Sequence, residues 1–279
     1  MSVRRTRLIA SSLVVVVSLA LVATLLIVST HRANGPAPQV RATDASVLTQ
    51  LSSVSPSVFN QIGVSGGATG LSPLRGAELR SNGKPDVVYV GAEFCPFCAA
   101  ERWALVVALA RFGTWHGLSS TESSTHPGEV FPGTPTFTFH GASYTSAYLN
   151  LTAVEAYSAT WDPTTGFYTP LMKPSALVSA LVAKYDTSTY LKSLSANETG
   201  ALPFLDIANR WGSSGASFSP GLLDGLSHQA IAHQVSTGTG TAGRAIVSAA
   251  NYITAGLCTV TGGAPAAVCS SAGVRGAAQ

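Results

Sequence analysis

The residues of this chain best suited to chemistry are two closely spaced cysteines, in the segment Cys95-Pro96-Phe97-Cys98. This spacing is typical of a dithiol that exchanges disulfides: one thiolate attacks, and the second thiol then resolves the mixed disulfide. The attacking cysteine needs a lowered pKa, because the thiolate is the nucleophile. We assign Cys95 as the attacking thiol and Cys98 as the resolving thiol.

The dithiol lies between two segments of different hydrophobic period. Before it, the β-branched apolar run at 86–92 predicts a buried strand. After it, apolar residues recur with helical spacing to about residue 111, and Gly113 is a suitable stop. Cys95 is therefore expected at a helix N-terminus, where unpaired N–H groups and the positive end of the helix dipole stabilise a thiolate. Pro96 suits a first helical turn.

Two other uses of the pair stay open. It could be an inert structural disulfide, or half of a four-cysteine zinc site. Zinc motifs normally supply two short-spaced pairs, whereas ten residues separate Cys258 from Cys269, so exchange is favoured. We interpret Cys258 and Cys269 as a structural disulfide, with a second redox pair as the alternative. We expect no cofactor and no bound metal.

A thioredoxin-like fold requires a further proline, usually cis, at the start of a later strand beside the thiols. Pro203 precedes an apolar strand pattern, a turn, a short return strand and a helix, which is the ending such a domain needs. Pro135 is the alternative, but no such ending follows it directly. We favour Pro203 and predict an α/β, thioredoxin-like domain at 83–279, with an insertion at about 120–196.

The first residues of the chain predict a membrane anchor. Residues 8–30 are uncharged and mostly apolar, and at about 1.5 Å per residue they can cross a bilayer core of about 30 Å. Three arginines in the tail 1–7 account for the whole net charge of +3, so the positive-inside rule places that tail in the cytoplasm and the body outside. A cleaved signal peptide is the alternative, although its apolar core is usually shorter. Residues 31–82 are interpreted as a linker and N-terminal extension.

The remaining charge pattern excludes one class of partner. Only 10% of residues are charged, and without the N-terminal arginines the chain is neutral, so we expect no nucleic-acid binding. Glu93 and Glu101 could carry a proton to or from the resolving thiol, but an exposed position is expected for each. Phe97 and Trp103 could form an apolar rim for a peptide, and Trp103 could equally belong to the core.

The chain also resembles a known family. The segments that carry the resemblance are Gly83-Lys84-Pro85, residues 88–105 around the dithiol, 109–113, 134–139, 203–210 and the late pair Cys258 and Cys269. Together, over roughly residues 46–272, they are similar to the family catalogued as domain of unknown function 929. The resemblance implies a thioredoxin-like, membrane-tethered protein of prokaryotes and brings no established substrate. More distantly, the dithiol is similar to the Cys-Pro-Tyr-Cys of glutaredoxins.

These observations predict a single-pass membrane protein whose extracytoplasmic domain is a thiol–disulfide oxidoreductase. Its expected partners are thiols or disulfides of exported proteins and a redox partner in the membrane. The alternative is a non-catalytic, thioredoxin-like binding module with structural disulfides. The sequence leaves oxidation, reduction and isomerisation open, because the potential depends on the relative stability of thiolate and disulfide.

Overall fold

The computed structural model describes residues 38–191, 193–194 and 199–278. Within them the chain has a mixed α/β architecture, which confirms the predicted class. The helices are α2 (Ala45–Ser52), α3 (Pro56–Ile62), α4 (Pro96–Leu109), α5 (Ala176–Tyr185), η1 (Pro220–Leu223), α6 (His228–Thr237), α7 (Thr241–Val260), α8 (Ala266–Cys269) and α9 (Ala272–Ala277). The strands are β1 (Arg41–Ala42), β2 (Ser72–Pro73), β3 (Arg80–Ser81), β4 (Lys84–Gly91), β5 (Gly113–His116), β6 (Ser119–Glu122), β7 (Pro135–Thr138), β8 (Ser143–Ser146), β9 (Asn150–Glu155), β10 (Tyr157–Asp162), β11 (Phe167–Pro170), β12 (Phe204–Ile207) and β13 (Trp211–Ser214).

The central sheet is built around β4. It runs in the order β2-β13-β12-β4-β3, and β9 also pairs with β4. β9 is parallel to β4, whereas β12 is antiparallel to β4 and to β13. The register sets Tyr89 opposite Leu205 on one side and Ala153 on the other, so the strand before the dithiol is held between two partners.

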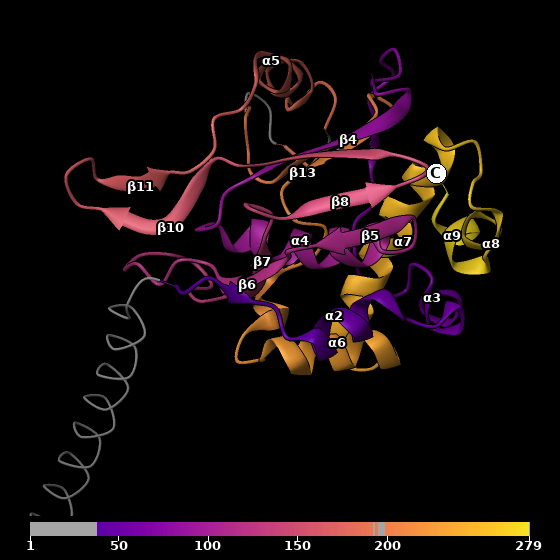
Figure 1. Ribbon diagram of the computed structural model, residues 1–279, viewed down its shortest axis with the longest axis horizontal. Coiled ribbons are helices and arrows are strands. Elements are labelled where there is room, and N and C mark those ends of the chain that lie inside the picture. The colour runs from indigo at the N-terminus through magenta and orange to yellow at the C-terminus, as the bar shows by residue number, and fades with distance from the viewer. Residues whose placement is uncertain (1–37, 192, 195–198, 279) are drawn as a thin grey trace, which may run out of the picture.

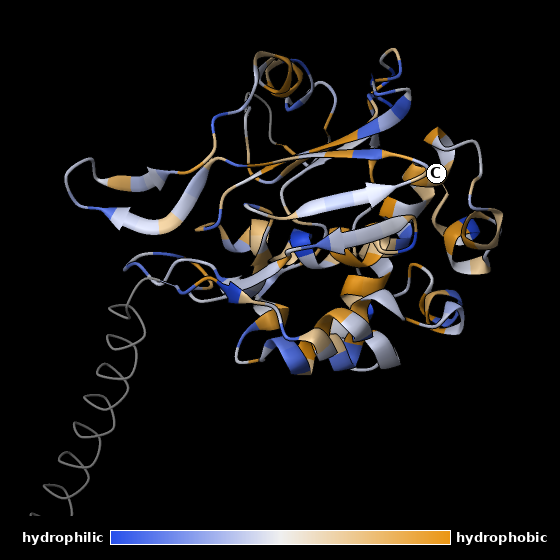
Figure 2. Ribbon diagram, in the orientation of Figure 1, coloured by the Kyte–Doolittle hydropathy of each residue, from blue (hydrophilic) through white to orange (hydrophobic). Residues whose placement is uncertain are grey.

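Helices cover both faces of this sheet (Figure 1). Alternate residues of β4 face opposite ways. Tyr89 belongs to the main core with α4 and α7, while Val88 packs with α5 in a smaller core. Figure 2 shows long apolar stretches in α7 and a pale, weakly polar β8. The β10–β11 hairpin projects from one end of the molecule (Figure 1).

The segment predicted as one insertion is divided by a core strand. β9 lies within residues 120–196, yet it pairs in parallel with β4 along six residue pairs, from Asp86↔Asn150 to Gly91↔Glu155. The accessory elements therefore form two groups, β5–β8 before β9 and β10–α5 after it. The Tyr-, Leu- and Thr-rich sequence at 143–157 does not identify β9 as a core strand, because the same pattern also fits an exposed hairpin.

The N-terminal extension also contributes to the fold. Val47 and Leu51 of α2 and Phe59 of α3 are buried in the main core, so residues 45–62 are packed helices rather than a free linker. The predicted anchor at 8–30 lies outside the described residues. In the described part of the chain, no helix combines the length and apolar character that a membrane crossing requires.

Candidate functional site: a dithiol at a strand–helix junction

The dithiol lies where β4 ends and α4 begins. Cys95 caps α4 with extended backbone angles, φ −78° and ψ 121°, and Pro96 occupies the first helical turn. The Cys95 Sγ accepts a hydrogen bond from the backbone N–H of Cys98 at 3.3 Å. A cysteine sulfur thus takes the place of the oxygen that usually caps a helix, and an orphan N–H of the first turn points at it.

The two thiols differ in access. Cys95 retains 6% of its surface and Cys98 retains none, and the structure has both as free cysteines. The Cys95 thiol donates to the Leu202 carbonyl oxygen at an S···O distance of 3.9 Å. The Leu202–Pro203 peptide bond is cis, and among the described residues only Pro265 shares that feature, so the bond before Pro135 is not cis. Of the two candidate prolines, Pro203 is therefore the one beside the thiols.

The surroundings shift the pKa values of the two thiols in opposite directions. Hydrogen bonding from Cys98, through its thiol and its backbone N–H, lowers the pKa of Cys95, and the positive charge of Arg102 acts in the same direction. Burial raises the pKa of Cys98 well above its usual value, and the neighbouring Cys95 raises it further. This is the asymmetry that an attacking and a resolving thiol need.

A buried ion pair lies beneath the dithiol. Arg102 Nε and Nη2 donate to the two carboxylate oxygens of Glu155 at 2.8 and 2.7 Å, and neither residue is exposed. Burial alone would lower the pKa of Arg102, but the Glu155 charge holds it well above its usual value. Burial raises the pKa of Glu155 and Arg102 opposes that rise. The bidentate geometry is that of an ionised pair.

The prediction that Glu93 and Glu101 are exposed is wrong. Glu93 is 5% exposed and accepts a hydrogen bond from the Thr138 hydroxyl. Glu101 is fully buried and accepts from the backbone N–H of Ser217 at 2.8 Å, and burial raises its pKa. Glu101 is buried because α4 is covered by protein from Cys98 to Leu109, so even its charged residues face protein. Glu93 lies in the turn before α4, where Thr138 contacts its carboxylate.

Aromatic residues surround the Cys95 side of the site. Phe94 stacks on Tyr168 with ring centroids 4.0 Å apart, and Tyr157 and Leu202 pack beside Cys95. Sequence reasoning missed Tyr157 and Tyr168 because they lie on the β10–β11 hairpin, 59 and 70 residues beyond Cys98 in the chain. It missed Phe94 because the partner of that ring, Tyr168, lies on the same distant hairpin.

Phe97 is part of an exposed apolar rim. It is 37% exposed, and its ring lies 6.2 Å from that of Phe131, which is 39% exposed. Trp103 is not in this rim: it is fully buried and donates to the Pro135 carbonyl at 2.8 Å. Phe131 was missed because nothing in the sequence of the 123–133 loop links it to the dithiol.

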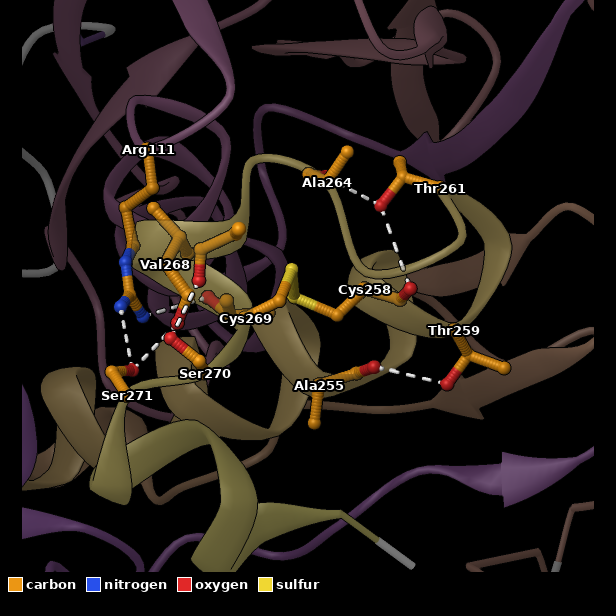
Figure 3. The surroundings of a disulfide bond; sticks show 12 residues. Arg111, Ala255, Cys258, Thr259, Thr261, Ala264, Val268, Cys269, Ser270 and Ser271 are labelled. Carbon is orange, nitrogen blue, oxygen red and sulfur yellow. Dashed lines mark hydrogen bonds between the residues drawn. A yellow bond between two sulfur atoms is a disulfide. The ribbon is translucent and has the colours of Figure 1, made fainter.

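The second cysteine pair is a disulfide. Cys258 and Cys269 are bonded with their Cα atoms 5.6 Å apart, and the bond joins the end of α7 to α8 (Figure 3). Both sulfurs are thereby occupied, which removes the second half of the four-cysteine zinc site considered above. No group of three or more His, Cys, Asp or Glu residues in the described ranges could hold a metal ion.

The fold and the site together define a mixed α/β protein with an asymmetric Cys-x-x-Cys dithiol at the N-terminus of a buried helix. In a comparison with known families, the model of a family described as domain of unknown function (DUF929) matches residues 73–259. The chain belongs to that family. No curated protein and no solved structure gave a significant match.

Proposed function

We propose that the protein is a membrane-anchored, extracytoplasmic thiol–disulfide oxidoreductase with a thioredoxin-like fold. The observation that carries the proposal is the placement of Cys95, which caps α4, has a lowered pKa and lies against the carbonyl that precedes cis-Pro203. A buried thiol of higher pKa, Cys98, stands one helical turn behind it. An inert structural disulfide requires none of these features.

The strand order supports the fold assignment. A thioredoxin-like core consists of a βαβ unit followed by a ββα unit, with the dithiol after the first strand. Here β4, α4 and β9 supply the first unit, β12, β13 and α7 supply the second, and the strands lie in the order β9-β4-β12-β13. The dithiol follows β4, and Pro203 immediately precedes β12.

In the reaction we propose, the Cys95 thiolate attacks one sulfur of a substrate disulfide. A bond forms between Cys95 and that sulfur, the substrate S–S bond breaks, and the electron pair leaves on the second substrate sulfur. Cys98 then loses its proton and attacks the Cys95 sulfur, which releases the first substrate sulfur as a thiolate and leaves a Cys95–Cys98 disulfide. Run in reverse, the same steps oxidise a substrate dithiol.

The location is part of the proposal. The apolar run at 8–30 would hold the domain at the membrane, with its C-terminal body on the extracytoplasmic side. The Cys258–Cys269 disulfide supports that side, because disulfides persist in oxidising compartments and are rare in the cytoplasm. Cysteines of exported proteins are then the substrates within reach.

Trapping tests the proposal. In Cys98→Ser the resolving step is absent, so mixed disulfides through Cys95 should accumulate. They should be visible as adducts on non-reducing gels and should disappear when dithiothreitol reduces them. The matched control, Cys95→Ser with Cys98→Ser, should form none, while its Cys258–Cys269 disulfide stays intact. An absence of adducts from Cys98→Ser, in cells where the equivalent variant of a known oxidoreductase gives them, would leave the non-catalytic binding module as the better account.

A further inference from the structure

A fully buried guanidinium lies under the dithiol. Arg102 follows Cys98 by four residues on α4, and residues at this spacing share one face of a helix. Helical side chains lean toward the N-terminus, so Arg102 extends toward the dithiol. Its Nη2 donates to the Ala92 carbonyl at 2.7 Å, and the same oxygen accepts from the Cys95 backbone N–H at 3.3 Å. One carbonyl thus joins the guanidinium to the loop that carries the nucleophile.

One nitrogen of the Arg102 guanidinium makes no hydrogen bond within the described residues. Glu155 and Ala92 occupy Nε and Nη2, whereas Nη1 is buried without a hydrogen-bond partner among the described residues. A buried donor left unpaired destabilises the folded protein. Glu155 fixes the plane of the guanidinium through two hydrogen bonds, so the free nitrogen cannot turn away to find a partner. The arrangement leaves one N–H donor of a charged group without a partner at the base of the site.

The Cys98 sulfur is the buried group near this guanidinium that must become an anion. Cys98 is completely buried, so no solvent can stabilise the thiolate that it must form in order to attack. Burial raises its pKa, and the positive charge of Arg102 opposes that rise. The internal cation therefore lowers the energy of a Cys98 thiolate, and a hydrogen bond from the Ala92 backbone acts in the same direction.

We propose that Arg102 stabilises the Cys98 thiolate in the resolving step and that Glu155 is a positioning residue that holds the guanidinium in place. The proposal rests on the proposed function, and it concerns one half-reaction. The Cys98 proton passes to solvent, a bond forms between the Cys98 and Cys95 sulfurs, and the bond from Cys95 to the substrate sulfur breaks. The electron pair leaves with the substrate sulfur.

Other titratable groups face this site. The Tyr89 hydroxyl of β4 is buried without a partner, and burial raises its pKa well above the usual value, so it stays neutral. The missing side chain of Gly91 makes room for it: a Cβ there would lie 2.2 Å from the Tyr89 oxygen. Glu93 lies close enough to Glu155 to influence its charge. Arg102 is the one cation among these groups.

A reaction with an aryl disulfide separates the two thiols. With 5,5′-dithiobis(2-nitrobenzoate), the full-length reduced protein should release one thionitrobenzoate as Cys95 attacks and a second as Cys98 resolves the adduct. The pH dependence of the second phase reports the ionisation of Cys98. Arg102→Met should slow that phase about tenfold or more near neutral pH and move its midpoint to higher pH, as expected when a nearby opposite charge is lost. Arg102→Lys should slow it less.

Two further variants make the test specific. Glu155→Gln keeps an acceptor for Arg102 but removes the opposing charge, so the midpoint of the second phase should move to lower pH. Arg111→Met is the matched control, because Arg111 lies just beyond α4, packs on Phe59 with its guanidinium carbon 3.9 Å from the ring centroid, and should leave the second phase unchanged. If Arg102 and Glu155 had only a structural role, the two substitutions would not shift the pH midpoint of the second phase in opposite directions.

The proposal is overturned if Arg102→Met and Arg111→Met change the second phase equally, or if the midpoints for Arg102→Met and Glu155→Gln move the same way. If Arg102→Met does not fold, as judged by its unfolding transition, the test uses the pH dependence of the second phase in Arg102→Lys and Glu155→Gln instead. The proposal is then overturned if the midpoint for Glu155→Gln does not move to lower pH. The reagent reacts with any accessible dithiol. These kinetics therefore remain measurable even if Cys98→Ser traps no cellular partner, which keeps failure of the proposed function distinct from failure of this inference.

Discussion

The two cysteine pairs of this protein lie at opposite ends of helices. Cys95 caps the N-terminus of α4, where N–H groups and the helix dipole favour a negative charge, whereas Cys258 lies in the last turn of the 20-residue α7, where carbonyl groups disfavour one. The first position stabilises a thiolate and the second destabilises it. The helix end at which a cysteine lies is thus one physical basis for separating a reactive pair from a structural one.

The neighbours of the two pairs reinforce this difference. Beside the dithiol are a buried cation, Arg102, and an exposed aromatic rim. The Cys258–Cys269 disulfide has small and hydroxyl-bearing neighbours, such as Ala255, Thr261 and Ala264 (Figure 3). The Arg111 guanidinium, also drawn there, donates to Asn251, Thr254 and Ser271. The disulfide fastens the end of α7 to α8, so its contribution is to stability.

The largest expected effect separates the pairs by activity. Cys95→Ser should abolish disulfide exchange, since no other thiol is both acidic and accessible at the site. Replacing Cys258 and Cys269 by alanine should leave the exchange rate within about twofold. The rate at which dithiothreitol reduces a disulfide-bonded protein in the presence of each variant measures this. A folded Cys258→Ala, Cys269→Ala variant without activity would show instead that the second pair relays electrons.

The next effect separates the pairs by stability. The Cys258–Cys269 bond closes a loop across 11 residues, and the chain-entropy model gives about 3 kcal/mol for a loop of that size. Its removal should lower the free energy of unfolding by about that amount. Cys95→Ala with Cys98→Ala should cost less, about 1–2 kcal/mol, because it deletes only the sulfur atoms of two small buried side chains. Urea unfolding of both double variants gives the comparison, and equal losses would contradict it.

Much of the site could be predicted from local sequence. The apolar run before Cys95 and the helical spacing after it are local patterns, and they placed β4, α4 and the cap correctly. Pro203 was recognisable because a strand pattern follows it within one residue. In each case the residues that determine the structure lie within about one element of the residue that does the chemistry.

The remainder depends on long-range pairing. Arg102 is buried because it meets Glu155, which lies 53 residues further along the chain on a strand that the sequence pattern assigned to an insertion. The β9 run Asn150-Leu-Thr-Ala-Val-Glu has too few apolar residues to be identified as a central strand without its partner β4. A charged residue on a helix is expected in solvent unless its partner is known, so a sequence pattern that does not identify β9 as a central strand also does not identify the partner of Arg102.

The contrast between stabilised and unstabilised negative charge extends to the other end of the sheet. Asp206 of β12 is fully buried, and within the part of the chain that the structure describes only one of its carboxylate oxygens has a hydrogen-bond partner, the backbone N–H of Asn209. Burial raises the pKa of Asp206 to about 7, and the neighbouring Asp86 adds to the rise. Cys95 has a cation and a helix N-terminus to support a negative charge, and Asp206 has neither.

A pH-dependent loss of stability follows. The folded protein holds the Asp206 proton up to about pH 7, whereas the unfolded chain releases it near pH 3.8. Stability from this group is therefore complete below pH 3.8 and is lost as the pH rises through 7, by about 2 kcal/mol between pH 5 and pH 8. Asp206→Asn should flatten that part of the profile in urea unfolding. An Asp206→Asn profile parallel to that of the unmodified protein would show that the carboxyl is already ionised.

The smallest expected effect concerns the aromatic rim, which the dithiol has and the disulfide lacks. Phe131→Ser should weaken the binding of a peptide disulfide with apolar residues beside its cysteines, because it removes about 1 kcal/mol of apolar contact, or about fivefold in KM. Leu177→Ser is the matched control, since Leu177 is 53% exposed on α5, away from the site. An aryl disulfide too small to reach the rim should react equally with all three proteins. Slower reaction of Phe131→Ser with both substrates would mean that the substitution distorts the dithiol, and an equal loss in Leu177→Ser would mean that the rim does not select the peptide.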